Sequence, residues 1–401
     1  MTGQLGLADF FEEFLNKQSI FIDKKALQQN YTPQVIPHRQ NQINQVAGIL
    51  APVLRKEKPS NIFCYGKTGT GKTVVVQYVI QKLLESASAR NVPLKTVYVN
   101  CKLKKIADTE YRIIAELARS LGKDVPSTGL PTDEVYNLFL EAIDEKEQTV
   151  LLVLDEVDRL VDRAGDEILY NLTRINGQLK KSQVSLVGIS NDVRFMDNID
   201  PRVKSSLGEE ETIFHPYNAM ELKEILEERA KLAFRPDVLE GGVLEKCSAY
   251  AAREHGDARR AIDLLRVASE VAERENATKI LPEHIDKAEE RIERDRVLEI
   301  TVTQPKQSQA VFRAILDIPV NKKIETGEVY EKYKGICSAA GLTPLTQRRV
   351  SDLIGELDML GLITAKVISK GRYGRTRQIY MTVSEDLSTK LKDKLKEELG
   401  I

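Results

Sequence analysis

The residues that could do chemistry begin with an eight-residue loop, GKTGTGKT, at positions 66–73. It fits the pattern G-x-x-x-x-G-K-[ST] between an apolar run and a segment with helical apolar spacing, the setting that a phosphate-binding loop requires. In such loops backbone N–H groups surround phosphate oxygens, a lysine reaches the β- and γ-phosphates, and a hydroxyl ligates Mg²⁺. Lys72 and Thr73 take the last two roles, and the pattern predicts a nucleoside triphosphate as the ligand. The other loop residues expected around the phosphates are Gly66, Lys67, Thr68, Gly69, Thr70 and Gly71.

A second reactive group is the acidic pair Asp155 and Glu156, which directly follows the apolar run VLLVL. A buried parallel strand reads as a continuous apolar run, and ligands of open parallel sheets bind at the carboxyl ends of the strands. A Mg²⁺–triphosphate site needs a carboxylate in that position. We therefore predict that Asp155 holds Mg²⁺ and that Glu156 activates the attacking water.

Alternating strand and helix patterns must position these groups, and such alternation argues for a parallel sheet covered by helices. The strand candidates are residues 61–65, 96–101, 149–154, 184–190 and 211–214. Only amphipathic helical patterns follow, up to about residue 296. The predicted domains are an N-terminal tail at 1–14, an α/β nucleotide-binding domain at 15–215 with a helical insertion at about 102–147, an all-α lid at 216–300 and a C-terminal domain at 301–401.

The C-terminal domain contains a predicted helix-turn-helix followed by a hairpin. Residues 343–363 place their apolar side chains on one helical face, with Thr346 as the expected N-cap. Between positions 341 and 380 there are seven basic and only three acidic residues, and the pattern resembles a winged-helix DNA-binding domain. The predicted DNA contacts are Gln347, Arg348, Arg349 and Ser351 on the helix and Lys370, Arg372, Tyr373, Arg375 and Arg377 in the wing. The final segment, 390–400, is predicted to be a solvated helix.

The composition of the 401-residue chain limits the remaining possibilities. Its formal net charge of −1 gives no overall preference for nucleic acid, so any such binding must be local. Its four cysteines are far apart and lack C-x-x-C spacing, which argues against a zinc site and favours reduced, buried thiols. No apolar run approaches the roughly 18 residues of a membrane span, and the N-terminus lacks the order of a signal peptide. We expect a cytoplasmic, nucleoid-associated protein with no membrane partner.

GKTGTGKT, LDEVD and the helical region behind them together resemble an AAA+ ATPase. The resemblance implies that Asn191, in VSLVGISND, orients the lytic water as a first sensor. It also implies that Arg202, with Lys204 as the adjacent positive candidate, is an arginine finger for a neighbouring subunit, and that Arg259, in GDARRAIDLL, is a second sensor. The residue types themselves predict that Asp257 caps the helix of Arg259. The other nucleotide contacts that the resemblance implies are Val35, Pro37, Arg39, Tyr217 and Arg229.

With the C-terminal domain included, nearly the whole chain resembles the archaeal replication initiators of the origin recognition and cell division control type. YTPQVIPHR, DPRVKSSL and SKGRYGRTR add to the motifs above, in the family's order. The resemblance implies ATP or ADP and Mg²⁺ as cofactors, a slow ATPase, and a nucleotide-controlled initiator that helps to load the replicative helicase. Its expected partners are double-stranded origin DNA, the minichromosome maintenance helicase and further initiator copies. A DNA-binding regulator of transcription or stress with a nearly silent ATPase remains the alternative.

Overall fold

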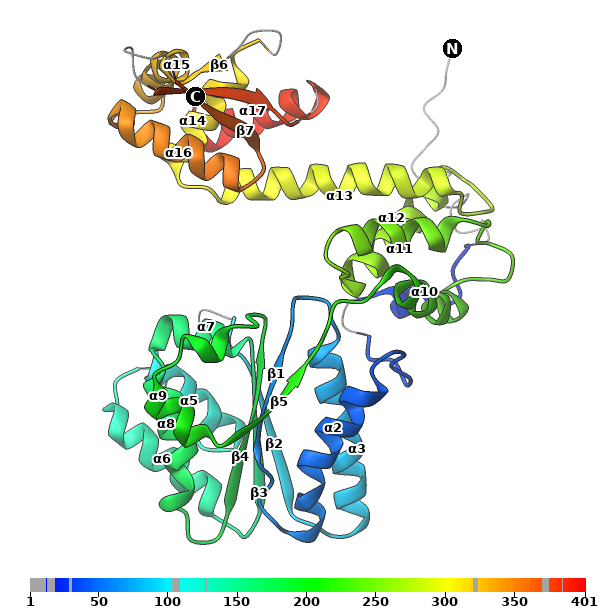
Figure 1. Ribbon diagram of the computed structural model, residues 1–401, viewed down its shortest axis with the longest axis vertical. Coiled ribbons are helices and arrows are strands. Elements are labelled where there is room, and N and C mark those ends of the chain that lie inside the picture. Colours follow the sequence, from blue (N-terminus) through cyan, green and yellow to red (C-terminus); the bar gives the residue numbers. More distant parts are fainter. Residues whose placement is uncertain are drawn as a thin grey trace. The chain divides into compact units, whose positions relative to one another are not determined.

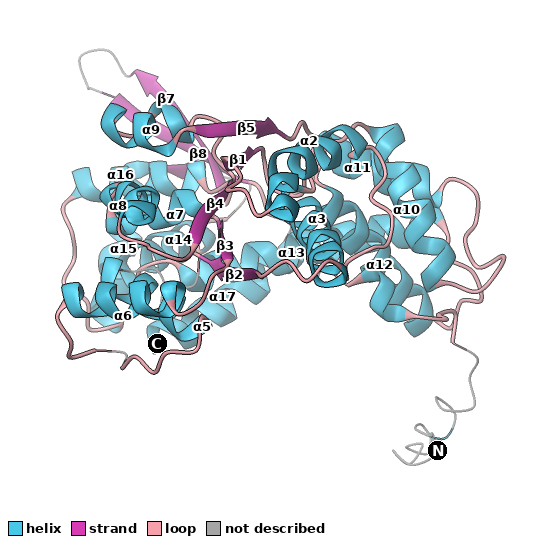
Figure 2. Ribbon diagram, turned by 90° about the horizontal axis from the view of Figure 1, so that it is seen from below, coloured by secondary structure: helices cyan, strands magenta, loops and turns pink. Residues whose placement is uncertain are grey.

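The computed structural model of the protein describes residues 12, 19–28, 31–102, 109–126, 128–319, 324–369, 375–383 and 385–401 (Figures 1 and 2). It divides into two compact units, Met1–Ile285 and Asp286–Ile401. Within the described residues, no helix combines the length and the apolar character needed to cross a membrane.

The first unit is built on a five-stranded parallel sheet, as the alternating pattern predicts. Its strands are in the order β2-β3-β4-β1-β5, and the predicted strand positions are confirmed with ends that differ by one or two residues. The strand bounds are β1 Asn61–Tyr65, β2 Leu94–Asn100, β3 Thr149–Asp155, β4 Gln183–Ser190 and β5 Glu209–Ile213. Every residue of β3 is buried because helices cover both faces of the sheet.

The helices form two layers on this sheet, with α2 and α3 on one face and α5 to α9 on the other (Figure 1). Successive side chains of a strand point to opposite faces. Leu151 and Val153 of β3 therefore pack in the core under α2 and α3, whereas Leu152 and Leu154 pack under the other layer. The helix bounds are α2 Gln40–Leu50, α3 Lys72–Ala89, α5 Glu110–Ser120, α6 Thr132–Asp144, α7 Val157–Ala164, α8 Glu167–Arg174 and α9 Pro201–Leu207. Helices α5 and α6 fall in the predicted insertion.

The lid of the first unit is helical, with α10 (Ala219–Ala233), α11 (Val243–Arg253) and α12 (Ala258–Arg274). The starts of α10 and α12 are fixed by side chains that accept hydrogen bonds from otherwise unsatisfied backbone N–H groups, whereas α11 begins after Gly242 without a side-chain cap. Asn218 and Glu221 form a capping box on α10. Asp257 accepts from the backbone N–H groups of Arg259 and Arg260, which confirms the predicted cap of α12.

An N-terminal segment, residues 19–28, packs on the lid helices, a contact that the sequence analysis did not anticipate. The rings of Phe21 and Phe234 are 5.4 Å apart, and the Ile22 N–H donates to the Ala233 carbonyl at 2.8 Å. Lys24 forms an ion pair with Glu270 at 3.2 Å. Nothing in the local sequence pattern names this partner, because the lid helices lie some two hundred residues downstream.

The second unit is a winged helix. Helix α13 (Pro282–Thr303) runs into it and is followed by α14 (Lys306–Leu316), β6 (Ile324–Glu325), α15 (Thr326–Ala339) and α16 (Gln347–Met359). Strands β7 (Ile363–Ser369) and β8 (Arg375–Met381) pair antiparallel, and β6 joins β8. The Thr346 hydroxyl accepts from the Arg349 N–H, which confirms the predicted cap of α16.

The last helix, α17 (Glu385–Leu399), corrects one expectation. We expected residues 390–400 to form a solvated helix. Instead Leu387, Leu391, Leu395 and Leu399 are buried in the core of the second unit. Leucines four residues apart form a single apolar stripe on a helix, and the lysines and glutamates between them disguise that stripe in the linear sequence.

This packing generates a stability prediction. Leu391 is fully buried, and Leu391→Ala should lower the free energy of unfolding of the second unit by about 2–5 kcal/mol, because a core leucine leaves a cavity. Hydrogen exchange of the slowest amides of α14 and α17 in the full chain measures this quantity. Lys396→Ala, an exposed site on the same helix, should change it by less than about 0.5 kcal/mol. Equal protection in the two variants would contradict the packing of α17.

Candidate functional site

A cavity of about 730 Å³ in the first unit brings together residues from the phosphate loop, the ends of β3 and β4, and the lid. Concave sites of this size with a few convergent polar groups bind small molecules. Most of the site residues predicted from the sequence line it. These are Val35, Pro37, Gly69, Gly71, Lys72, Thr73, Asp155, Glu156, Asn191, Tyr217, Arg229 and Arg259.

The remaining predicted residues lie elsewhere in the first unit. Thr70 is buried within the loop, and Arg39 is buried next to it. Lys67 and Thr68 are exposed on it, and Gly66 is buried at its start. Arg202 is exposed in the first turn of α9 and does not line the cavity. The role that the resemblance implies for Arg202, an arginine finger for a neighbouring subunit, therefore stays a prediction.

The phosphate loop touches the lid directly. Gly69 has φ +68°, a conformation that glycine adopts without strain. A Cβ atom there would lie 1.7 Å from Asp257 Oδ1, so the lid approaches too closely for any side chain. The Ala258 N–H, at the start of α12, donates to the Gly69 carbonyl at 3.1 Å. The N-terminal end of α12, with its partial positive charge, therefore faces the loop.

Lys72 is folded into the loop. Its Nζ atom donates to the carbonyls of Gly66 and Lys67, each at 2.7 Å. Burial lowers the pKa of Lys72 to about 8, against the opposing effect of the nearby Asp155 carboxylate. Only 5% of the residue is exposed. The ammonium group thus sits among backbone groups at the floor of the cavity.

Asp155 lies at the end of β3 with both carboxylate oxygens engaged. The Thr73 hydroxyl donates to Oδ2 at 3.0 Å, and the Glu156 N–H donates to Oδ1 at 2.9 Å. Carboxylate and hydroxyl oxygens are hard ligands of the kind that Mg²⁺ prefers. The chemistry and proximity of the two predicted metal ligands therefore fit this ion.

Sequence reasoning missed Tyr98, on β2. Its hydroxyl also donates to Asp155 Oδ2, at 2.5 Å. Burial, followed by the bond to Asp155, raises the pKa of Tyr98 well above its usual range. Tyr98 has apolar neighbours in the sequence, so the local pattern predicts a strand residue and gives no sign of a role at the site. Only the register of β2 on β3 would have revealed that it reaches Asp155.

The two candidate groups for water activation are held by backbone geometry. Glu156 has φ +56°, an uncommon conformation for a residue other than glycine, and it immediately precedes α7. The Asn191 N–H donates to Asp158 Oδ1 at 3.2 Å, just beyond β4. Both residues line the cavity on the side of Asp155.

Arg39 has a structural environment that its predicted nucleotide contact did not suggest. Its guanidinium donates to the carbonyls of Thr70 at 2.9 Å and His215 at 2.6 Å. It also stacks on the Tyr217 ring, 3.6 Å from the centroid. Burial lowers its pKa. Arg39 therefore joins the segment before α2, the phosphate loop and the entrance to the lid.

Arg229 has a similar role on α10. It donates to the carbonyls of Ala26 and Tyr31 at 3.1 and 3.3 Å and stacks on the Tyr31 ring at 4.5 Å. Tyr31 also lines the cavity. Arg229 thus attaches the N-terminal segment and one wall of the cavity to the lid.

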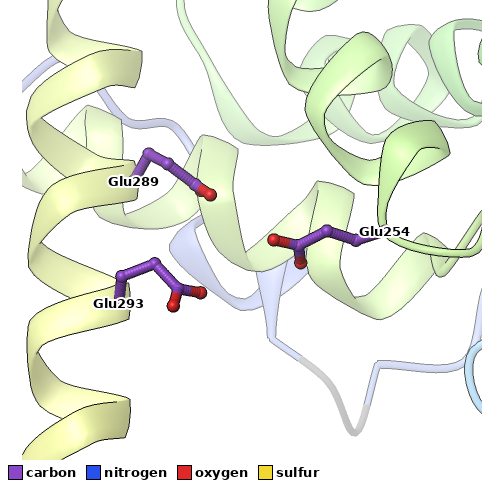
Figure 3. Close-up of side chains that lie close together, drawn as sticks. All are labelled: Glu254, Glu289 and Glu293. Carbon is purple, nitrogen blue, oxygen red and sulfur yellow. The ribbon is translucent and has the colours of Figure 1, made fainter. Parts of the chain in front are cut away.

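Three glutamates outside the cavity are drawn in Figure 3. Glu289 and Glu293 project from one face of α13, four residues apart, and Glu254 is the residue that follows α11. None belongs to the predicted metal site, and partly exposed carboxylates commonly gather without an ion. We assign them no ligand.

Four of the predicted DNA contacts of the second unit lie near the start of α16. Gln347, Arg348 and Arg349 are exposed there, and Ser351 is partly buried. Arg349 forms an ion pair with Glu356 at 3.2 Å.

In the wing, the guanidinium of Arg377 lies against α16. A Cβ atom on Gly355 would be 2.8 Å from Arg377 Nη1. Arg375 begins β8. The predicted contacts Lys370, Arg372 and Tyr373 lie outside the described residues.

Models of three known domain families match the chain in order. They are an AAA domain over residues 55–196, a Cdc6 AAA+ ATPase-type lid domain over 223–290, and a CDC6 C-terminal winged helix domain over 299–390. Together with the parallel sheet and the phosphate loop, they define the class as AAA+ ATPases with a lid and a C-terminal winged helix.

Relatives match nearly the full length. The ORC1-type DNA replication protein of Pyrococcus abyssi is 52% identical over 391 residues, which cover 95% of this chain and 92% of the relative. ORC1-type DNA replication protein 1 of Methanosarcina mazei is 49% identical over 389 residues, with 96% and 93% covered. The structure of the Aeropyrum pernix ORC1 protein in complex with DNA matches with a TM-score of 0.82 and 44% identity, over 95% of this chain and 98% of that one. The chain belongs to the family of ORC1-type DNA replication proteins.

The environment of Arg39 generates a prediction. Arg39→Lys should lower the stability of the first unit by about 2 kcal/mol, because one ammonium group cannot serve both carbonyls and stack on Tyr217. Hydrogen exchange of β1 and α3 amides measures the loss. Arg90→Lys is the control, since Arg90 is exposed at the end of α3 and its guanidinium donates to the Ser86 carbonyl of that helix. Indistinguishable exchange in the two variants would show that Arg39 does not join these segments.

Proposed function

We propose that the protein is an ATP-dependent initiator of DNA replication, which binds origin DNA and helps to recruit or load the replicative helicase. The observation that carries this proposal is the combination, in one chain, of the Lys72–Thr73–Asp155 constellation with a winged helix whose exposed recognition helix begins with basic residues. Family membership supports the same function, and the Aeropyrum pernix relative was solved with DNA.

In the proposed nucleotide site, Lys72 exchanges its two loop carbonyls for β- and γ-phosphate oxygens. Thr73 and Asp155 hold Mg²⁺, which supplies charge neutralisation of the phosphates when it is bound. Glu156 accepts the proton of the attacking water, and Asn191 orients that water. Arg259, which is close enough to Lys72 to lower its pKa, adds positive charge from the lid.

The adenine side of the proposed site is formed by the segment that includes Val35 and Pro37, with Tyr217 at the base of the lid. The contacts of Arg39 and Arg229 suggest that these two arginines act by holding this wall in place. Arg202, exposed on α9, is available to a neighbouring initiator copy as an arginine finger. Hydrolysis by an isolated copy is then slow.

Nucleotide acts as a switch in this proposal. The loop and the lid touch through Gly69, Asp257 and Ala258, so a γ-phosphate that repositions the loop changes the contacts of the lid. A ligand shifts such an equilibrium only by its differential affinity for the two states. The proposed partners are double-stranded origin DNA, the minichromosome maintenance helicase and further initiator copies, encountered in the cytoplasm at the nucleoid.

The nucleotide site is tested by two variants. Lys72→Ala should weaken ATP binding about 100-fold or more, because each hydrogen bond to a charged group contributes about 1.5–3 kcal/mol. Glu156→Gln should keep the ATP affinity within about threefold and lower the hydrolysis rate by about 10²–10⁴-fold. Titration with a fluorescent ATP analogue and phosphate release measure the two quantities. Unchanged ATP binding by Lys72→Ala would refute the site.

The recognition helix is tested by the salt dependence of binding to duplex DNA. Arg348→Ala should weaken binding and reduce the slope of log K against log salt by about one, because one phosphate contact is lost. Fluorescence anisotropy at several salt concentrations measures both. Lys396→Ala removes a charge from α17 in the same unit and should leave the slope unchanged. The same slope for Arg348→Ala and the native protein would exclude a phosphate contact by Arg348.

A further inference from the structure

Tyr98 reaches Asp155 because of the register of the sheet. Strands β2 and β3 are parallel, with Tyr98 opposite Val153 and Asn100 opposite Asp155. Side chains two residues apart on a strand share a face, so Tyr98, Asn100 and Asp155 project to the same side. That side is also covered by α3, whose first turn carries Thr73. The register of β2 therefore places the Tyr98 hydroxyl next to the Asp155 carboxylate, and the phosphate loop does not contribute to this contact.

Three donors fix the Asp155 carboxylate. Oδ1 accepts from the Glu156 N–H at 2.9 Å, and Oδ2 accepts from the Thr73 hydroxyl at 3.0 Å and from the Tyr98 hydroxyl at 2.5 Å. The terminal torsion of an aspartate is broad and only weakly restrained by its own chemistry. If Thr73 turns its hydroxyl oxygen toward a metal ion, Tyr98 is the side-chain donor that still holds Oδ2.

The Tyr98 side chain lies at the surface of the sheet, next to α3. Asn100 lies two residues further along the same face of β2, and its Oδ1 atom accepts from the Lys102 N–H at 2.9 Å. The Tyr98 ring borders a shallow groove with Gln77 and Ile80 of α3. With 43% of the residue exposed, the hydrogen bond to Asp155 is the polar contact that orients the phenol.

We propose that Tyr98 is a positioning residue for the metal site, which orients the Asp155 carboxylate for Mg²⁺ while leaving the phosphate contacts untouched. The inference rests on the proposed function, in which Thr73 and Asp155 bind that ion. Partners that orient a metal ligand typically contribute about 10–100-fold to metal affinity. Lys72 and the loop glycines bind phosphate independently of the phenol.

The test is Tyr98→Phe in the full chain, which removes one oxygen and keeps the ring. ATP affinity is measured first in EDTA and then as free Mg²⁺ is titrated. The Mg²⁺ half-point is the free Mg²⁺ concentration that gives half of the Mg²⁺-dependent gain in ATP affinity. It should rise about tenfold or more in Tyr98→Phe, while the ATP affinity in EDTA stays within about twofold. Tyr78→Phe, the same change on α3, is the matched control and should leave both quantities unchanged. A melting curve in EDTA verifies that both variants fold.

The outcomes distinguish the positioning role of Tyr98 from the proposed Mg²⁺ site. An unchanged Mg²⁺ half-point in Tyr98→Phe overturns the positioning role, while the Mg²⁺ dependence of the native protein still supports the proposed site. An affinity that falls equally in EDTA makes Tyr98 a nucleotide contact and also overturns the inference. If the native protein binds ATP with no dependence on Mg²⁺, the proposed metal site fails, and the role of Tyr98 fails with it.

Discussion

The contact between the phosphate loop and the lid is the constraint on which the first unit depends. Gly69 has no side chain, and this allows Asp257 and the start of α12 to approach the loop. Arg39 stabilises the same junction by donating to the carbonyls of Thr70 and His215 and by stacking on the Tyr217 ring. Without this junction the cavity would lose the wall that carries Arg259. The ligand site is therefore a property of the sheet and the lid together.

Local patterns predicted much of this architecture. The strands, the loop between β1 and α3, the position of Asp155 at the end of β3 and the caps at Asp257 and Thr346 are confirmed because each depends on residues close together in the sequence. The two-layer covering of the sheet follows from continuous apolar runs such as residues 150–154 of β3. In the same way, the basic start of α16 is visible in the sequence and exposed in the structure.

Tertiary contacts account for what the sequence did not predict. Tyr98 depends on strand register, and the attachment of residues 19–28 depends on partners far along the chain. The guanidinium groups of Arg39 and Arg229 are occupied by backbone carbonyls, which no motif specifies. Helix α17 was misjudged because charged residues separate its buried leucines. In each case the local sequence is compatible with several environments, and packing selects one.

In the proposed function, the nucleotide lies between the sheet and the lid, and the lid is followed along the chain by α13 and the winged-helix unit. The central claim is that the chain marks the place where replication begins. The most direct measurement is the genome-wide occupancy of the protein in its host, mapped alongside the start sites of replication. The account predicts that the strongest occupancy coincides with a replication start. Occupancy of many promoters with none at a replication start would contradict it and favour a transcriptional regulator.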